Sequence, residues 1–177
     1  KINKRTKDGL NGHEHYMIKE IKEQPDVLSH ALSNYLEFSE FKIKENKFDF
    51  NFSNVNRIII SACGTAYFAG MVAKYWFENI ANIKVDLEIA SEFRYKKMFF
   101  DDTSICLFIS QSGETADTLA ALKYAKQNNQ KIISIVNTEE SSISNESDLI
   151  NNSDFDKFYI NKNRLEYLKS KSNLSIN

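Results

Sequence analysis

Four short apolar segments, separated by segments with helical character, constrain the fold of this chain more than any other feature. They are RIIIS at 57–61, KVDLEIA at 84–90, SICLFIS at 104–110 and KIISIVN at 131–137. Their length and their β-branched and apolar residues predict strands. Because the strands are nearly continuous apolar runs, we expect helices on both faces of the sheet. Strands alternating with helices favour a parallel sheet with right-handed crossovers, in an α/β fold with three α/β/α layers.

The intervening segments supply the helices of this prediction. Residues 62–81 begin with a Gly-Thr turn and continue as a helix, and residues 114–129 form a second helix with one apolar side. Residues 91–100 are expected to connect two strands with at most a helical turn. Residues 141–150 predict a short helical turn followed by the beginning of a fifth strand.

The N-terminal segment 14–37 carries apolar residues at spacings of three and four, which is typical of an amphipathic helix. Pro25 predicts that this segment forms two helices, because proline suits a first turn and disrupts a helix interior. We therefore expect a helical lead-in and connection over 1–54 and an α/β domain over 55–150. A polar tail follows at 151–177, with a short amphipathic helix near Arg164–Lys169.

Composition excludes several classes of function. The formal net charge is −1, which gives no general reason to bind nucleic acid or an anionic membrane. No apolar run approaches the ~20 residues that span a bilayer. The two cysteines, Cys63 and Cys106, form no disulfide framework, which favours a cytoplasmic location. His13 and His15 lack a partner motif for a metal, and no dinucleotide or P-loop motif is present, so we expect no metal or cofactor.

Two turns follow predicted strands and open predicted helices. One is Ser61–Ala66 (SACGTA) and the other is Ser110–Thr115 (SQSGET). In a 2-1-3-4-5 strand order, the first and third strands are neighbours, so both turns face one crevice at the carboxyl ends of the strands. Unpaired N–H groups and the dipole at a helix start bind anions without a cationic side chain. The two turns therefore predict a phosphate site on a small molecule.

Simpler interpretations stay open for these residues. Serine and threonine at helix starts are most often N-caps, and Glu114 suits the helix dipole more readily than it acts as a catalytic base. Cys63 fits a small buried apolar residue better than a reactive thiol. We expect the aromatic residues of the first long α/β helix to be core and interface residues: Tyr67, Phe68, Tyr75, Trp76 and Phe77.

Four motifs resemble one enzyme family. GHEHYMIKEIKEQP, ACGTAYFAGMVAKYWFE, EIASEFRY and ISQSGETADTLAAL, in this order, resemble the isomerase half of glucosamine-6-phosphate synthases. These enzymes are also called glutamine–fructose-6-phosphate aminotransferases (isomerizing). The resemblance covers roughly residues 12–150, the first sugar isomerase (SIS) domain and its helical lead-in. It implies a flavodoxin-like, five-stranded parallel sheet, and homodimers.

The resemblance also implies a ligand and its contacts. It assigns the phosphate of fructose 6-phosphate or glucosamine 6-phosphate to Ser110, Gln111, Ser112, Thr115 and Thr65, with further backbone contacts from Gly64 and Gly113. The family usually has serine where this chain has Ala66, so one hydroxyl contact is expected to be missing.

The same resemblance predicts that this chain alone is inactive. The family's glutaminase domain, second SIS domain, proton-transfer glutamate and ring-opening histidine have no counterpart in the sequence. After NESDLI the tail no longer aligns, which suggests a truncated or split gene product, or a fragment. The alternative is a stand-alone, non-catalytic SIS module that senses a phosphosugar.

Overall fold

A computed structural model describes residues 10–40, 42–43, 52–138, 140–152 and 158–160. The chain divides into two compact units, residues 1–45 and residues 46–177, and each is considered by itself. The predicted helix near Arg164–Lys169 lies outside the described residues.

The first unit contains one long helix, α1 (Tyr16–Tyr35), which runs through Pro25 without interruption. The prediction of two helices separated at this proline was therefore wrong. A proline removes one donor and crowds one carbonyl, but the N–H groups of the turns on either side still bond within the helix. Two short strands, β1 (Leu36–Glu37) and β2 (Lys42–Ile43), then pair antiparallel.

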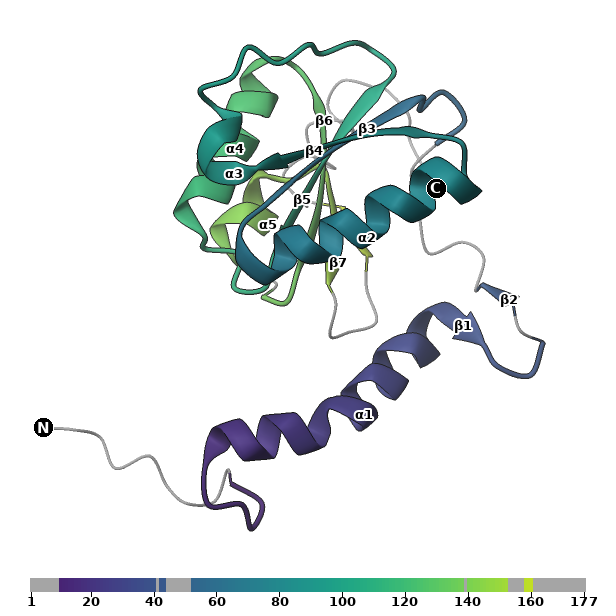
Figure 1. Ribbon diagram of the computed structural model, residues 1–177, viewed down its shortest axis with the longest axis vertical. Helices are drawn as coiled ribbons and strands as arrows, with labels where there is room; N and C mark the ends of the chain where they lie inside the picture. The colour runs from purple at the N-terminus through teal and green to yellow at the C-terminus, as the bar shows by residue number, and fades with distance from the viewer. Residues whose placement is uncertain (1–9, 41, 44–51, 139, 153–157, 161–177) are drawn as a thin grey trace, which may run out of the picture. The chain divides into compact units, whose positions relative to one another are not determined.

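The second unit is built on a six-stranded sheet, shown in Figure 1. Its strand order is β4-β3-β5-β6-β7-β8. The first five strands in this order are parallel, and β8 is antiparallel to β7. The strands are β3 (Arg57–Ala62), β4 (Lys84–Ile89), β5 (Ser104–Ser110), β6 (Lys131–Val136), β7 (Leu149–Asn152) and β8 (Phe158–Ile160). The predicted flavodoxin-like order of the five parallel strands is confirmed.

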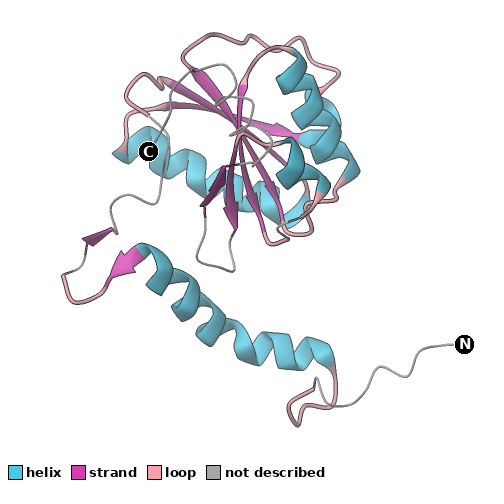
Figure 2. Ribbon diagram, turned by 180° about the vertical axis from the view of Figure 1, so that it is seen from behind, coloured by secondary structure: helices cyan, strands magenta, loops and turns pink. Residues whose placement is uncertain are grey.

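Helices cover both faces of this sheet, as Figure 2 shows. One face carries α3 (Ala90–Phe93), α4 (Ala116–Gln127) and α5 (Ser142–Glu146), with a core that includes Phe93, Phe108, Leu122 and Ile143. The other carries α2 (Gly64–Ile80), whose Ala73 and Phe77 pack on a second core that includes Ile58, Ile60, Val85 and Ile105. The expected three α/β/α layers are confirmed.

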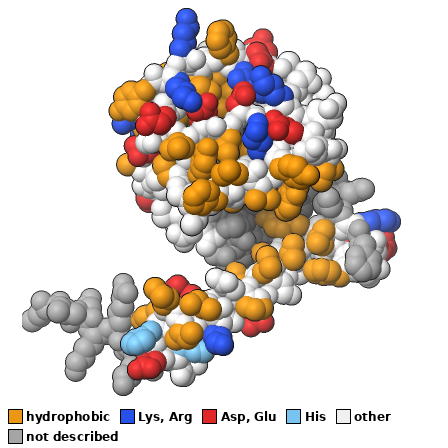
Figure 3. Space-filling model, in the orientation of Figure 1, with side chains coloured by type: hydrophobic (Ala, Val, Ile, Leu, Met, Phe, Trp, Pro, Cys, Tyr) orange, Lys and Arg blue, Asp and Glu red, His pale blue; other side chains and the backbone are white. Residues whose placement is uncertain are grey.

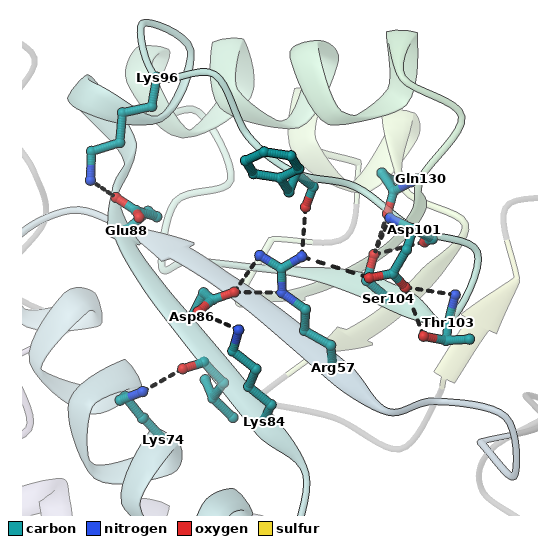
Figure 4. Close-up of polar contacts among 12 residues, drawn as sticks. Arg57, Lys74, Lys84, Asp86, Glu88, Lys96, Asp101, Thr103, Ser104 and Gln130 are labelled. Carbon is teal, nitrogen blue, oxygen red and sulfur yellow. Dashed lines mark hydrogen bonds and ion pairs between the residues drawn. The ribbon is translucent and has the colours of Figure 1, made fainter.

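A charged cluster joins the strands at the end of the sheet where β3 begins (Figure 4). The Arg57 side chain, 16% exposed, forms an ion pair with Asp86 of β4. It also donates a hydrogen bond of 2.6 Å to the carbonyl oxygen of Phe99 and lies 3.7 Å from the Asp101 carboxylate. The pKa of Asp101 is lowered, first by hydrogen bonds from Thr103 and then by the Arg57 charge. Arg57 thus holds the connection before β5 against β3 and β4.

Replacing Arg57 with methionine should lower the free energy of unfolding by about 1–3 kcal/mol, because two carboxylates lose their partly buried cation. Lys84→Met is the matched control, since Lys84 lies 4.0 Å from the same Asp86 carboxylate but is 68% exposed. That change should cost less than about 0.5 kcal/mol. Urea denaturation of both variants measures the difference, and equal losses would show that the Arg57 cluster contributes nothing beyond a surface ion pair.

Candidate functional site

Two loops follow neighbouring strands at the same edge of the sheet. The strand register places Ala62, the last residue of β3, beside Ile109 of β5. The loop after β3 leads into α2, and the loop after β5 leads into α4. The structure therefore brings the two sequence-predicted turns to adjacent positions at the carboxyl ends of β3 and β5.

The loop after β3 is short and open. Cys63 precedes α2 and packs partly buried against the core, as expected for a small apolar residue. Gly64 begins the helix with φ +57°, and Gly64 and Thr65 are exposed. Ala66 offers no hydroxyl group at the next position. This loop therefore presents one hydroxyl side chain, that of Thr65, and an accessible backbone.

Ser110 holds the second loop from within. Its side chain is buried, and its Oγ accepts a hydrogen bond of 3.2 Å from the Gly113 N–H. The Ser110 and Thr115 hydroxyl oxygens lie 2.9 Å apart, so one of these hydroxyls donates to the other. One of the two hydroxyl protons is thus used inside the loop, and the other stays available to an acceptor outside it. Thr115 makes no side-chain N-cap bond, so the plain N-cap interpretation does not hold for it.

Three side chains of this loop are exposed: the carboxylate of Glu114, described below, and two that can donate hydrogen bonds, Gln111 and Ser112. The Ser112 Oγ accepts a hydrogen bond of 3.2 Å from the Glu114 N–H, which leaves its O–H group to donate outward. The Gln111 carbonyl oxygen accepts a bond of 3.1 Å from the Asn137 N–H, just after β6. The backbone is therefore anchored while both side chains stay accessible.

Helix α5 fixes the far side of the loop. The Ser142 N–H donates to Glu114 Oε1 at 2.7 Å, and the Ile143 N–H donates to the Gly113 carbonyl oxygen at 3.0 Å. Hydrogen bonding from Ser142 lowers the pKa of Glu114, which keeps this carboxylate ionised. Glu114 had been expected to suit the dipole of its own helix. In the structure its carboxylate accepts from the first N–H group of α5, that of Ser142.

A glycine is needed at position 113 because Ser141 of the neighbouring segment packs directly against it. Its φ is +67°, and a Cβ atom there would lie 2.0 Å from Ser141 Oγ. Ser141 is the N-cap of α5, and its Oγ accepts a hydrogen bond from the Ser144 N–H. The absence of a side chain at Gly113 thus lets α5 approach the loop.

The hydrogen-bond donors of this site are uncharged N–H and O–H groups. Residues 110–118 contain no lysine or arginine. The first N–H groups of α4, from Ala116 to Thr118, have no partner within an α-helix and point out of its positive end. With the hydroxyls of Ser112 and Thr115, they form a set of donors that suits the oxygen atoms of an anion.

Thr118, Asn137 and Ser141, which lie near the loops, were not singled out from the sequence, whereas Ser61 begins the first predicted turn. Ser61 Oγ and Thr118 Oγ1 are buried and have no hydrogen-bond partner among the described residues. Asn137 and Ser141 support the loop after β5 from neighbouring elements. No local pattern marks Asn137 or Ser141, because each supports a loop residue that is distant in the sequence.

Neither a metal site nor a membrane span emerges from the part of the chain that the structure describes. Among those residues, no group of three or more histidine, cysteine, aspartate or glutamate side chains is arranged to hold a metal ion. None of the described helices combines the length and apolarity needed to cross a bilayer.

Comparison with protein families identifies the region that contains both loops. Residues 51–155 match the model of the SIS domain. The chain is 54% identical over 138 residues to the glutamine–fructose-6-phosphate aminotransferase [isomerizing] of Brucella abortus, a match that covers 78% of this chain and 23% of the relative. It is 51% identical over 138 residues to the protein of the same name from Agrobacterium fabrum. The aligned region is thus about a quarter of the length of these relatives.

Solved structures agree with this comparison. The C-terminal domain of glucosamine-fructose-6-phosphate aminotransferase from Francisella tularensis superimposes with a TM-score of 0.72 and 42% identity. The match covers 84% of this chain and 41% of that domain. A phosphosugar isomerase homologue involved in capsule formation in Bacteroides fragilis, at 20% identity and a TM-score of 0.60, shares the fold.

Proposed function

This chain belongs to the SIS domain family, and we propose that its loops after β3 and β5 bind the phosphate group of a hexose 6-phosphate. The observation that carries the proposal is the loop at residues 110–115. Its backbone is anchored by Asn137 and α5, Gln111 and Ser112 present hydrogen-bond donors outward, the Glu114 carboxylate is bonded to α5, and the loop leads into the positive end of α4. Donors that are already held in place lose little conformational entropy when they bind an anion.

Each residue has a distinct part in the proposed contact. Ser112 and Thr115 donate hydroxyl protons to phosphate oxygen atoms, and Gln111 adds its side-chain amide. Ser110, which is buried, orients Thr115 and the Gly113 N–H. From the other loop, Thr65 contributes a hydroxyl and Gly64 a backbone contact. Ala66 supplies no hydroxyl, which weakens the contact from this side.

The sugar is proposed to be fructose 6-phosphate or glucosamine 6-phosphate. Support comes from the relatives that share about half of their aligned residues with this chain, whose name contains fructose 6-phosphate. We limit the proposal to binding, because the family's acid–base residues have no counterpart among these residues. Glu114, the acidic residue of the loop, has its carboxylate bonded to α5.

The setting proposed for this activity is the cytoplasm. Cys63 and Cys106 are both free thiols, and burial raises the pKa of Cys106 to about 12. A buried neutral thiol packs as a small apolar group and is resistant to disulfide exchange, as suits a reducing compartment. A homodimer is proposed as well, as the resemblance to the aminotransferase family implies.

Amide chemical shifts test where the ligand binds. Adding fructose 6-phosphate to ¹⁵N-labelled protein should shift the amide resonances of Gly64, Thr65, Ser112, Thr115 and Ala116 more than any others. Fructose without its phosphate should leave these five resonances in place. Largest shifts in the helix at 16–35, or along the outer edge of β4, would place the ligand elsewhere and contradict the proposal.

A further inference from the structure

Strand β4 lies at the edge of the six-stranded sheet, and among the described residues only β3 pairs with it. Successive residues of a strand direct their N–H and C=O groups to opposite sides. The Lys84 N–H donates to the carbonyl oxygen of Asn56, so Lys84 and every second residue after it face β3. Ile83, Val85 and Leu87 therefore direct their backbone groups away from the sheet. Such a row, when unpaired, is a template for pairing with another chain.

Helix α2 binds the first of these outward groups. The Ile83 N–H donates to the carbonyl oxygen of Phe77, near the end of α2, at 3.1 Å. Two residues further along β4, the Val85 N–H donates to Glu78 Oε1 at 3.2 Å. Lys74 Nζ donates to the Val85 carbonyl oxygen, and Figure 4 shows the Lys74 side chain reaching from α2 toward β4. Both outward groups of Val85 thus have a partner from α2.

Lys74 and Glu78 also hold each other in place. Lys74 Nζ donates to Glu78 Oε1 at 2.7 Å, across one turn of α2. The hydrogen bond from Lys74, and after it the bond from the Val85 N–H, lowers the pKa of Glu78, so this carboxylate stays ionised. One member of the pair is an acceptor and the other is a donor, as are the C=O and N–H groups of a neighbouring strand. The Lys74–Glu78 pair therefore takes the place of one residue of such a strand.

The rest of the β4 edge is short. Leu87 is the next residue with outward backbone groups, and Ile89 already serves as the N-cap of α3. One open residue is far fewer than the roughly 5–6 residues of an ordinary strand. A groove of about 530 Å³ runs beside Val85 and Leu87, and both Lys74 and Glu78 line it. The pair thus lies where an added strand would have to pass.

Charges on the faces of β4 do not replace this protection. Charged side chains alternate along the strand at Lys84, Asp86 and Glu88, and Figure 3 shows positive and negative side chains side by side on the face of this unit that carries α2 and β4. Unpaired charges on an edge strand discourage pairing. Asp86, however, forms an ion pair with Arg57, and Glu88 forms one with Lys96. Protection of the edge therefore depends on the backbone groups being occupied.

We propose that α2 closes the edge of the sheet at β4, and that the Lys74–Glu78 pair prevents an extended segment of another chain from adding as a strand beside Val85. The surface concerned is the edge of β4, and the excluded partner is any segment that offers a free row of backbone N–H and C=O groups. This proposal stands independently of sugar binding.

Lys74→Ala/Glu78→Ala removes the pair without changing the net charge. In the folded full chain, the Val85 amide should exchange with solvent roughly tenfold faster, while the buried Ile59 amide of β3 stays protected. The variant should also form thioflavin-T-positive assemblies roughly fivefold faster than the wild type, or more. Within these assemblies the Val85 amide should be protected again, because the added strand now binds it.

Lys19→Ala/Glu23→Ala is the matched control, since these residues form an ion pair of the same spacing in α1, at 3.6 Å. It should assemble no faster than the wild type. Equal acceleration in this control would overturn the proposal, and so would unchanged assembly of Lys74→Ala/Glu78→Ala. Should that variant unfold, seen as lost protection at Ile59, Lys74→Ala alone must still assemble faster than Lys19→Ala, and equal rates would contradict the proposal.

Discussion

Replacing Gly113 with alanine should lower the free energy of unfolding by about 3 kcal/mol, a large effect for one methyl group. The backbone at Gly113 has φ +67°, and an L-residue in this region costs about 1–2 kcal/mol. The new Cβ would also lie 2.0 Å from Ser141 Oγ, and overpacking of this kind costs about 1–3 kcal/mol. Chemical denaturation of the variant measures the sum.

Gly64→Ala separates these two costs. Gly64 has φ +57°, but a Cβ there would have no atom within 4 Å, so only the backbone cost of about 1–2 kcal/mol should appear. Adding Ser141→Gly to Gly113→Ala should recover part of the loss, because the clashing side chain is gone and glycine is a tolerable N-cap. Equal losses at Gly64 and Gly113 would mean that α5 does not press against the loop.

Short apolar runs were enough to predict the parallel strands of the sheet, but not the antiparallel β8, which lies in the segment predicted as a polar tail. The β-branched runs at 57–61 and 131–137, and the helices between them, lie within a few residues of their predicted bounds. Local composition decides such elements, since each strand buries both faces and each helix has one apolar side. The right-handed crossover rule then leaves few strand orders, and the flavodoxin-like order is one of them.

Contacts between distant segments were beyond prediction. Glu114 bonds to Ser142, and Gly113 lies against Ser141, at separations of 28 residues. No local pattern marks such a pair.

The predicted break of the N-terminal helix at Pro25 was wrong. The helix continues through Pro25, because the turns on either side of a proline still hold a helix together. Phe68, Tyr75 and Trp76 were expected in the core or an interface. They are exposed in the structure, so the core interpretation was wrong for these three aromatic residues.

The double variant Ser112→Ala/Thr115→Val should reduce the affinity for fructose 6-phosphate by roughly a hundredfold or more. Each hydroxyl that donates to a charged phosphate contributes about 1.5–3 kcal/mol, and about 1.4 kcal/mol is tenfold in affinity. The fold should survive, since Ser112 is exposed and Thr115 makes no side-chain cap bond to α4. Isothermal titration calorimetry measures the affinity.

Ser39→Ala/Thr103→Val removes the same two kinds of hydroxyl from other places. Ser39 bonds to Glu37 after α1, and Thr103 bonds to Asp101 just before β5 begins, at the opposite edge of the sheet from the candidate loops. This control should bind fructose 6-phosphate as the wild type does. If both double variants lose affinity equally, the loss reflects a general weakening of the protein and the site assignment is wrong.

The proposal that this SIS domain holds a sugar through its phosphate is tested most directly by titrating the wild-type chain with two ligands side by side. Fructose 6-phosphate should give a saturable heat of binding, and fructose at the same concentrations should give none. The difference is expected because the donors of Ser112, Thr115 and the first turn of α4 are arranged for an anion. Equal heats for both sugars, or none for either, would contradict a phosphate site in these loops.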